Sequence, residues 1–495
     1  MNTPLRRVAI AVMVLVVALL ANATYVQVIK ADSLRTDPRN SRVLLDEYSR
    51  QRGQISSGGQ VLASSVATDD RYKYLRTYPA NPAAPSSPFA NAPVTGFYSM
   101  LYASSGLERS EDEVLNGSDN RLFGKRFTDL LSGRDPRGGN VVTTIDPVMQ
   151  QVAYDQLTSK GYTGSVVAIE PSTGKILTMV STPSYDPNLL SSHDGTQSTQ
   201  AWEALQADPT NPLVNRAVSQ TYPPGSTFKV VVTAAALAAG ETPEDQLTAA
   251  SNITLPDTST TLENYGGQSC GGGATASLRD AFARSCNTAF VELGIKTGAD
   301  ALKSTSSAFG IGEDAAGVPI PVADSTVGDI PDDAALGQSS IGQRDVALTP
   351  LQNAEIAATV ANGGVRMAPH LVASLQGPDL STLSTTDPQS LGQAVSPEVA
   401  STLTSLMVGS ENATTGVGKI AGVQIASKTG TAEHGSDPRN TPPHAWYIAF
   451  APAESPKIAI AVIVEDGGDR ALAATGGSVA APVARAVIAA GLQGR

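Results

Sequence analysis

The chain is poor in cysteine, histidine, aromatic residues and positive charge. Its 495 residues include two cysteines and four histidines, and its 34 Lys and Arg are outnumbered by 46 Asp and Glu, which leaves a formal net charge of -12. Nucleic-acid binding needs a basic face, and this composition excludes it. The two cysteines and the histidines show no metal-ligand spacing, so we expect no metal site. The histidines are His193, His370, His434 and His444.

One long apolar stretch lies at the N-terminus. Arg6 and Arg7 precede residues 8–29, which can span a bilayer as a helix that rises about 1.5 Å per residue. The arginines should stay cytoplasmic, which places the chain after about residue 30 outside the membrane. A cleaved signal peptide is the competing interpretation, because Ala21-Asn22-Ala23 resembles a cleavage site. Both interpretations export the rest of the chain.

The two cysteines, Cys270 and Cys286, therefore lie in an oxidising compartment. They either pair or remain two free thiols, because sequence alone does not show whether their Cα atoms are close enough for a disulfide.

The length exceeds what one hydrophobic core usually holds, so we expect more than one folded unit. Residues 1–30 form the cytoplasmic tip and the membrane segment. Residues 31–140 lack long apolar periodic segments and are predicted to form an extended membrane-proximal module that is not catalytic. Residues 141–495 are strongly globular and form the predicted catalytic domain.

This domain has strand patterns at both ends and helical patterns between them. The expected strands are residues 166–169, 176–180, 447–450 and 457–464, and the expected helices include residues 227–239 and 481–492. The valines in residues 227–239 leave some strand ambiguity. The order predicts an α+β fold, in which helices flank an antiparallel sheet built from sequence-distant strands.

Three short motifs then occur in order, and each has a decoy elsewhere in the chain. The first is Ser226-Thr227-Phe228-Lys229, where one helical turn separates a hydroxyl from an amine that can take its proton. Pro223-Pro224-Gly225 precedes it and an apolar helix follows. Its decoy, residues 172–175, lies in a hairpin turn, where the lysine cannot be buried. We therefore predict Ser226 as the nucleophile, although helix capping alone is the simpler alternative.

The second motif is Ser285-Cys286-Asn287, which precedes a helical segment and places a hydroxyl and an amide at the start of that helix. Its structural alternative is again a helix cap. The decoy Ser118-Asp119-Asn120 lies before the globular part begins. We therefore favour Ser285 and Asn287.

The third motif is Lys428-Thr429-Gly430, at the end of an expected edge strand that continues to Thr431. There the lysine points into a cleft, the glycine lets another backbone approach, and the hydroxyls bind a carboxylate. The decoy Lys296-Thr297-Gly298 closes a helix instead.

With these motifs the chain resembles the class B penicillin-binding proteins, and most closely their actinobacterial A type. The resemblance extends from about residue 50 to the C-terminus. Further stretches that resemble the family are residues 52–55, 61–63, 144–150, 180–188, 215–226, 348–352 and 361–364.

The resemblance implies a peptidoglycan D,D-transpeptidase that cross-links D-Ala-D-Ala stem peptides, is inhibited by β-lactams and needs no cofactor. It assigns the attack to Ser226 after Lys229 accepts its proton. Ser285 relays a proton to the leaving group, and Lys428 supplies positive potential. Asn287 binds the donor backbone.

The same resemblance assigns the terminal carboxylate to the hydroxyls of Thr429 and Thr431, on either side of Gly430. The backbone N–H groups of Ser226 and Thr431 form the implied oxyanion hole. A disulfide between Cys270 and Cys286 would then tether a loop at the edge of the cleft.

The implied partners are a membrane-embedded glycan polymerase and proteins of cell division or elongation, because residues 31–140 are too few for a glycosyltransferase domain. Class A β-lactamases take their water-activating base from a Glu-x-x-Leu-Asn segment. This segment does not occur here, which argues against a β-lactamase. A D,D-carboxypeptidase and a non-catalytic β-lactam-binding sensor or division scaffold remain as alternatives.

Overall fold

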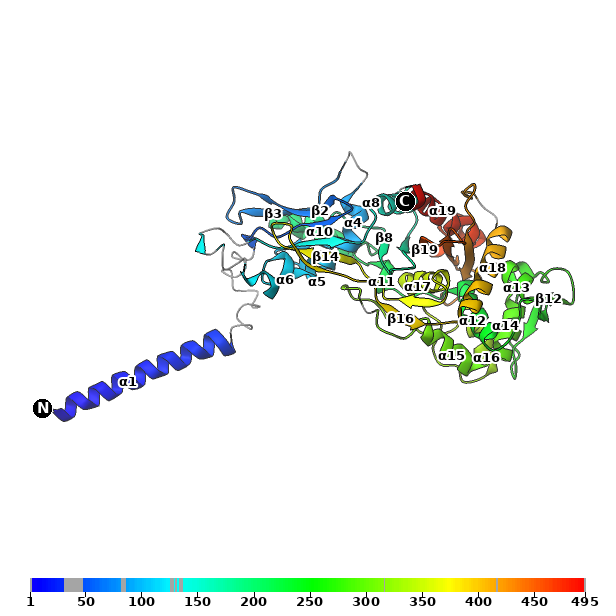
Figure 1. Cartoon of the computed structure of the whole chain (residues 1–495), viewed down its shortest axis with the longest axis horizontal. Helices are drawn as coiled ribbons and strands as arrows, with labels where there is room; N and C mark the ends of the chain where they lie inside the picture. The colour runs from blue at the N-terminus through cyan, green and yellow to red at the C-terminus, as the bar shows by residue number, and fades with distance from the viewer. Residues whose placement is uncertain are drawn as a thin grey trace.

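The computed structural model describes residues 2–30, 48–81, 86–124, 129, 131–132, 137–315, 317–414 and 417–493. Residues 31–47, with which the predicted membrane-proximal module begins, lie outside the described residues. Helix α1 (Asn2–Thr24) continues in a π-helical turn (Tyr25–Ile29) and projects from an elongated body, as Figure 1 shows. Its apolar span, Thr3–Ile29, has a mean hydropathy of 2.3 and is exposed along its whole length, so it is long and apolar enough to cross a membrane.

The central sheet of the body has five antiparallel strands in the order β17-β18-β19-β7-β8. The strands are β7 (Gly164–Ile169), β8 (Ile176–Thr182), β17 (Ala426–Ala432), β18 (His444–Ala451) and β19 (Ile458–Val464). The predicted α+β fold with a sheet of sequence-distant strands is confirmed, because β19 from the C-terminal hairpin pairs directly with β7 from the N-terminal hairpin.

Helices cover both faces of this sheet. On one face α8 (Pro147–Thr158) and α19 (Ala481–Gln493) pack against each other and against the sheet. On the other face lies α17 (Pro350–Ala361), α18 (Pro397–Ala413) packs directly against β17, and α12 (Lys229–Ala238) packs against α18. All strand residues of β7, β8, β18 and β19 are buried, as a sheet between two helical layers requires.

The remaining helices and short strands extend the domain and hold the second motif. They are α13 (Leu278–Arg284), α14 (Asn287–Thr297), α15 (Ala299–Ala308), α16 (Asp333–Ser339), β9 (Gln246–Thr248), β10 (Asn252–Thr254), β11 (Thr261–Glu263), β12 (Thr275–Ser277), β13 (Val365–Met367) and β16 (Ser390–Gln393). Helices α13 to α16 and strand β12 form the green lobe in Figure 1.

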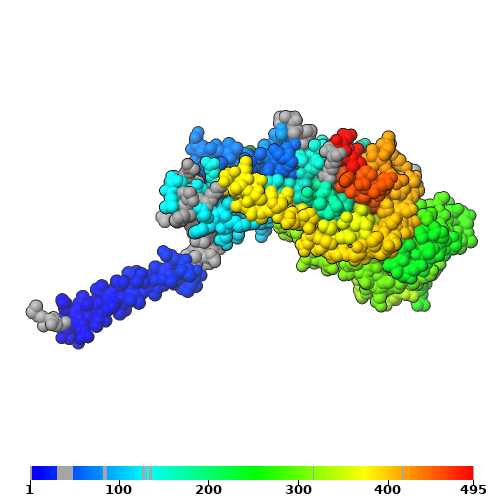
Figure 2. Space-filling model, viewed as in Figure 1, coloured from blue at the N-terminus to red at the C-terminus, as the bar shows by residue number. Residues whose placement is uncertain are grey.

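A second, six-stranded sheet lies toward α1, in the order β15-β14-β6-β1-β2-β3. Its strands are β1 (Ile55–Ser57), β2 (Gln60–Ala67), β3 (Tyr74–Thr77), β6 (Asn140–Thr143), β14 (Val372–Gln376) and β15 (Thr382–Thr385). The sheet is mixed, since β1 and β6 are parallel. The hairpin β14–β15 comes from the middle of the chain, and Figure 2 shows this yellow segment lying over the blue and cyan module. Sequence patterns did not predict this pairing.

Short helices complete this part of the chain. They are α4 (Pro88–Thr95), α5 (Gly106–Ser110), α6 (Asp112–Leu115), α9 (Pro187–Ser191), α10 (Gly195–Ala207) and α11 (Arg216–Ser219), with a small hairpin of β4 (Tyr98–Ser99) and β5 (Ala103–Ser104).

A buried ion cluster holds this module together around Glu108. The Nε atoms of Arg52 and Arg76 donate to the two carboxylate oxygens of Glu108 at 2.7 and 2.6 Å. Burial alone would raise the pKa of Glu108, but the two guanidinium groups outweigh burial and lower the pKa. The first family-like stretch, which begins at Arg52, therefore has a structural role here.

A second buried cluster lies behind β17, the strand that carries the third motif. The Glu411 carboxylate on α18 accepts hydrogen bonds from Arg485 Nη2 at 2.7 Å, from Ser427 Oγ at 2.6 Å and from the Tyr447 hydroxyl at 2.7 Å. Arg485 is fully buried. These contacts connect α18, β17, β18 and α19 at one point, so they fix the strand next to Lys428.

The substitution Arg485→Met should therefore lower the stability of the catalytic domain by about 3–5 kcal/mol, because it leaves the Glu411 carboxylate buried without its cation. The urea midpoint of the full chain measures the loss. The matched control is Arg279→Met, since Arg279 forms an exposed ion pair with Glu244 at 2.7 Å, which contributes about 0–1 kcal/mol. Equal shifts for the two variants would contradict a structural role for the buried cluster.

Candidate active site

The nucleophile motif begins in a tight turn rather than in the helix itself. Gly225–Thr227 form a 3₁₀ turn, and α12 begins only at Lys229. Gly225 has φ +53°, and a Cβ there would lie 2.8 Å from the Thr431 carbonyl oxygen, so the turn packs directly on β17. Ser226 is half-buried, and its hydroxyl makes no hydrogen bond to a residue that the structure describes. Residues 229–238 are helical, which resolves the strand ambiguity.

The amine of Lys229 is buried at the base of the cleft. Its Nζ donates to the Ser285 carbonyl oxygen and to Asn287 Oδ1, each at 2.8 Å, and lies 3.5 Å from Ser285 Oγ. The side chain is fully buried, and no carboxylate is among these partners. Burial, and then the nearby charge of Lys428, hold the pKa of Lys229 well below its usual range. The neutral amine that results is able to accept a proton.

Ser285 lies between the two lysines of the site. Lys428 Nζ donates to Ser285 Oγ at 2.9 Å and to the Thr429 carbonyl oxygen at 3.1 Å. Burial lowers the pKa of Lys428 to about 7. Ser285 itself has φ +61°, which is uncommon for a residue with a Cβ, and this left-handed position ends α13 and turns the hydroxyl toward both amines.

The other predicted binding residues lie along the same cleft. Asn287 begins α14, accepts from Lys229 and donates to the Glu263 carbonyl oxygen at 2.9 Å. Thr429 and Thr431 are half-buried in β17, the edge strand of the sheet. Gly430 lies between them, and a Cβ there would be 2.8 Å from the Pro224 carbonyl oxygen. The close approach of two backbones therefore requires glycine at this position.

Cys270 and Cys286 form a disulfide with their Cα atoms 5.9 Å apart. Cys286 follows Ser285 directly, and both cysteines are buried. The bond ties the loop that contains Cys270 to the chain between α13 and α14, which carries the second motif.

The decoy motifs lie far from this arrangement of contacts. Ser172 is in the turn between β7 and β8, and Lys175 is 43% exposed beside Glu170. Lys296 is 54% exposed at the end of α14 and pairs with Glu241 at 2.6 Å. Ser118 lies in an exposed turn after α6. Neither Lys175 nor Lys296 is buried, so neither amine has the desolvated surroundings that favour a neutral proton acceptor.

Sequence reasoning missed several residues that hold the chain just before the Gly225–Thr227 turn in place. The Tyr222 hydroxyl donates to Glu465 Oε1 at 2.6 Å, and Arg216 Nε donates to the same oxygen at 2.9 Å. Trp446 Nε1 donates to the Pro223 carbonyl oxygen at 3.0 Å. Burial and the charge of Glu465 raise the pKa of Tyr222, which therefore stays a donor. No local pattern marks Glu465, because it is distant in sequence from the residues that it holds.

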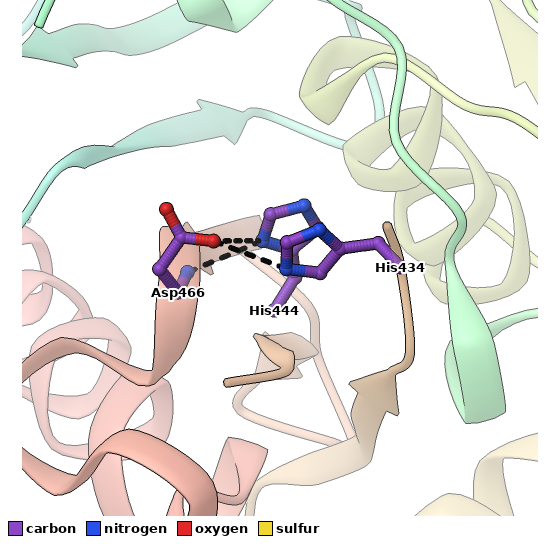
Figure 3. Close-up of side chains that lie close together, drawn as sticks. All are labelled: His434, His444 and Asp466. Carbon is purple, nitrogen blue, oxygen red and sulfur yellow. Dashed lines mark hydrogen bonds and ion pairs between the residues drawn. The ribbon is translucent and has the colours of Figure 1, made fainter. Parts of the chain in front are cut away.

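Two of the histidines lie beside a carboxylate, although their spacing in the sequence shows no ligand pattern. His434, His444 and Asp466 lie together near the end of β17, as Figure 3 shows, and their potential ligand atoms are all within 4.8 Å of one another. Sequence spacing missed this group because the aspartate comes from the turn after a different strand.

Comparison with known proteins gives the family. Residues 164–489 match the penicillin binding protein transpeptidase domain, and residues 52–141 match the penicillin binding protein A dimerisation domain. The chain therefore belongs to the penicillin-binding protein transpeptidase family. The class predicted from the sequence, a serine-type D,D-transpeptidase of the class B penicillin-binding proteins, is confirmed.

The chain is 65% identical to peptidoglycan D,D-transpeptidase PbpA of Mycolicibacterium smegmatis, over 100% of this chain and 99% of the relative. It is 63% identical to the protein of the same name from Mycobacterium tuberculosis, over 100% of both chains. Among solved structures, the ceftriaxone acyl-enzyme complex of penicillin-binding protein A from M. tuberculosis superposes with a TM-score of 0.87 at 62% identity. That match covers 91% of this chain and 100% of the other.

The lysine pair predicts a specific pH dependence of β-lactam acylation. In the wild type the rate should rise as Lys229 loses its proton and fall as the pH passes about 7, where Lys428 becomes neutral. In Lys428→Gln the pKa of Lys229 should rise, because the neighbouring charge is gone, so the acidic limb moves to higher pH and the limb near 7 disappears. The maximal rate should fall about 10²-fold.

The measurement is the pH profile of penicillin acylation by the detergent-solubilised full chain. Lys296→Gln is the matched control, because it removes the exposed lysine of the decoy motif and should leave the profile unchanged. An acidic limb that stays in place in Lys428→Gln would show that the rate does not report the protonation of Lys229.

Proposed function

We propose that Ser226 is the acylated nucleophile of this peptidoglycan D,D-transpeptidase and that Lys229 is its general base. The observation that carries the proposal is the convergence of two buried lysine amines on one hydroxyl, since Lys428 Nζ lies 2.9 Å and Lys229 Nζ 3.5 Å from Ser285 Oγ. A buried amine without a carboxylate partner is costly to protonate, and this is the state that an acceptor of a hydroxyl proton needs.

In the acylation step Ser226 Oγ attacks the carbonyl carbon between the two D-alanines, and its proton passes to Lys229. The developing oxyanion accepts hydrogen bonds from the backbone N–H groups of Ser226 and Thr431, and the close packing of Gly225 on Thr431 supports this pairing. The C–N bond then breaks.

The leaving D-Ala nitrogen takes a proton relayed through Ser285. The relay is supported by the two short steps from Lys229 to Ser285 and from Lys428 to Ser285. Lys428 supplies positive potential. The hydroxyls of Thr429 and Thr431 hold the terminal carboxylate, and Asn287 binds the donor backbone. An amine of a second stem peptide then attacks the acyl-enzyme through the same groups in reverse.

Intact-mass measurement after incubation with a penicillin tests the nucleophile. The wild-type chain should gain the mass of one penicillin and keep it for hours, and Ser226→Ala should gain nothing. The control is Ser172→Ala, which removes the serine of the decoy first motif and should be acylated like the wild type.

An adduct that persists in Ser226→Ala would overturn the assignment. Rapid loss of the adduct with release of hydrolysed drug would instead indicate a β-lactamase. No adduct on the wild type would contradict both the transpeptidase and the β-lactamase hypotheses.

Transfer must also be separated from hydrolysis, because a D,D-carboxypeptidase shares every residue named above and replaces the acceptor amine with water. A donor ester with and without a D-amino acid acceptor distinguishes them. A transpeptidase forms the amide product in proportion to the acceptor, and a carboxypeptidase forms only the free acid. A non-catalytic sensor or scaffold forms neither product.

For the rest of the chain we propose a single-pass membrane protein with a cytoplasmic N-terminus and an extracytoplasmic catalytic domain. Residues 31–140 form a non-catalytic pedestal between them, and a membrane-embedded glycan polymerase is the partner that makes the strands. The proposal is supported by the exposed apolar span Thr3–Ile29 and by Arg6 and Arg7 at its start.

The N-terminal mass of the protein purified from membranes tests whether the span is an anchor. We expect an intact N-terminus and a chain that stays with the membrane after an alkaline wash, because the 27-residue span Thr3–Ile29 remains in the bilayer. A mature chain that begins at Thr24 and washes off would identify a cleaved signal peptide instead.

A further inference from the structure

Three potential metal ligands meet beside the cleft and take no part in the acyl transfer described above. His434 follows β17, His444 is the first residue of β18, and Asp466 lies in the turn after β19. His434 Nε2 is 3.0 Å from Asp466 Oδ1, and His444 Nδ1 is 3.9 Å from the same oxygen. Figure 3 shows both imidazoles presenting a nitrogen toward the carboxylate.

These separations suit a tetrahedral ion. Zinc lies about 2.1 Å from nitrogen and oxygen ligands, which places two ligand atoms of a tetrahedral site about 3.4 Å apart. The measured values of 3.0 and 3.9 Å lie on either side of that separation. The Pro442 carbonyl oxygen, 2.9 Å from His434 Nε2, is a further oxygen within reach. Two imidazoles with one carboxylate are a donor set that zinc and related transition metals prefer over magnesium or calcium.

The electrostatic state of the group also favours a cation. His444 Nδ1 accepts the Asp466 N–H at 3.3 Å, so this nitrogen presents a lone pair toward the carboxylate. The Asp466 side chain is 64% exposed, which leaves the carboxylate accessible to an ion from solvent.

One rearrangement is required. The two imidazoles are parallel, with their centroids 3.7 Å apart and an interplanar angle of 4°, and two parallel rings cannot both point their lone pairs at one ion. The His434 ring is the one that can tilt, because it lies at the rim, whereas His444 is buried in β18. Ion binding would replace one hydrogen bond of His444, the one that its Nδ1 accepts from the Asp466 N–H. This hydrogen bond is long, at 3.3 Å, and therefore weak.

We propose that His434, His444 and Asp466 bind a divalent transition-metal ion of the zinc class. The ion connects Asp466, in the turn after β19, to His434, which follows β17 and lies three residues after Thr431. His444 also contacts Tyr222, three residues before the Gly225–Thr227 turn, in a T-shaped arrangement with their ring centroids 5.4 Å apart. The site is separate from the groups that transfer the acyl chain, so its occupancy is measured independently of activity.

Calorimetric titration of the chelator-treated full chain with zinc chloride tests the proposal. We expect saturable binding of one ion per chain, and at least tenfold weaker binding in His434→Gln and in Asp466→Asn. The matched control is His193→Gln, because His193 also pairs with a carboxylate, Asp70, at 2.5 Å but has no second histidine beside the pair. Its zinc affinity should equal that of the wild type.

Titration with cobalt(II) supplies a second readout. A tetrahedral site gives intense visible absorption, which should appear in the wild type and in His193→Gln and be lost in Asp466→Asn. Asp466 is exposed on a turn, so this variant keeps its fold, and its metal-free melting temperature checks that it does. No saturable binding to the wild type, or equal binding to Asp466→Asn, would overturn the proposal and leave a hydrogen-bonded cluster only.

Discussion

Two buried lysine amines lie beside one serine hydroxyl, and the chemistry proposed for the site depends on their proximity. Lys229 and Lys428 are both fully buried, both lie within 3.5 Å of Ser285 Oγ, and neither has a carboxylate as a hydrogen-bond partner there. Burial lowers the pKa of both amines, and the charge of Lys428 lowers that of Lys229 further. In the proposed mechanism one amine serves as the base and the other supplies positive potential.

The cleft keeps this geometry because rigid elements meet at it from several parts of the chain. The Gly225 turn packs on Thr431 and Gly430 packs against Pro224, so the backbone of the Ser226 turn lies directly against the edge strand. Behind that strand the buried Glu411 and Arg485 pair connects two helices to the sheet. The Cys270–Cys286 disulfide restrains the chain directly after Ser285. The candidate metal group would add a restraint at the remaining end of β17.

Local sequence was informative wherever the deciding forces are local. Period and composition predicted the strands of the two terminal hairpins, since apolar β-branched runs next to turn residues have few other stable conformations. The valines before Ala239 left helix and strand open, and packing under the sheet decided for helix. The pairing of β14 and β15 with the membrane-proximal sheet was not predictable, because a strand pattern does not identify a partner more than 200 residues away in sequence.

The sequence by itself determined the class of protein, the order of the three motifs and the residue types at Ser226, Lys229, Ser285 and Lys428, because chemistry restricts which side chains can do this work. Only the tertiary structure decided which lysines are buried, and burial is what separates Lys229 and Lys428 from the exposed Lys175 and Lys296 of the decoys. It also decided that Glu465 supports the nucleophile turn and that Asp466 joins two histidines. Contacts between distant segments arise from the packing of the whole sheet, and no short pattern encodes them.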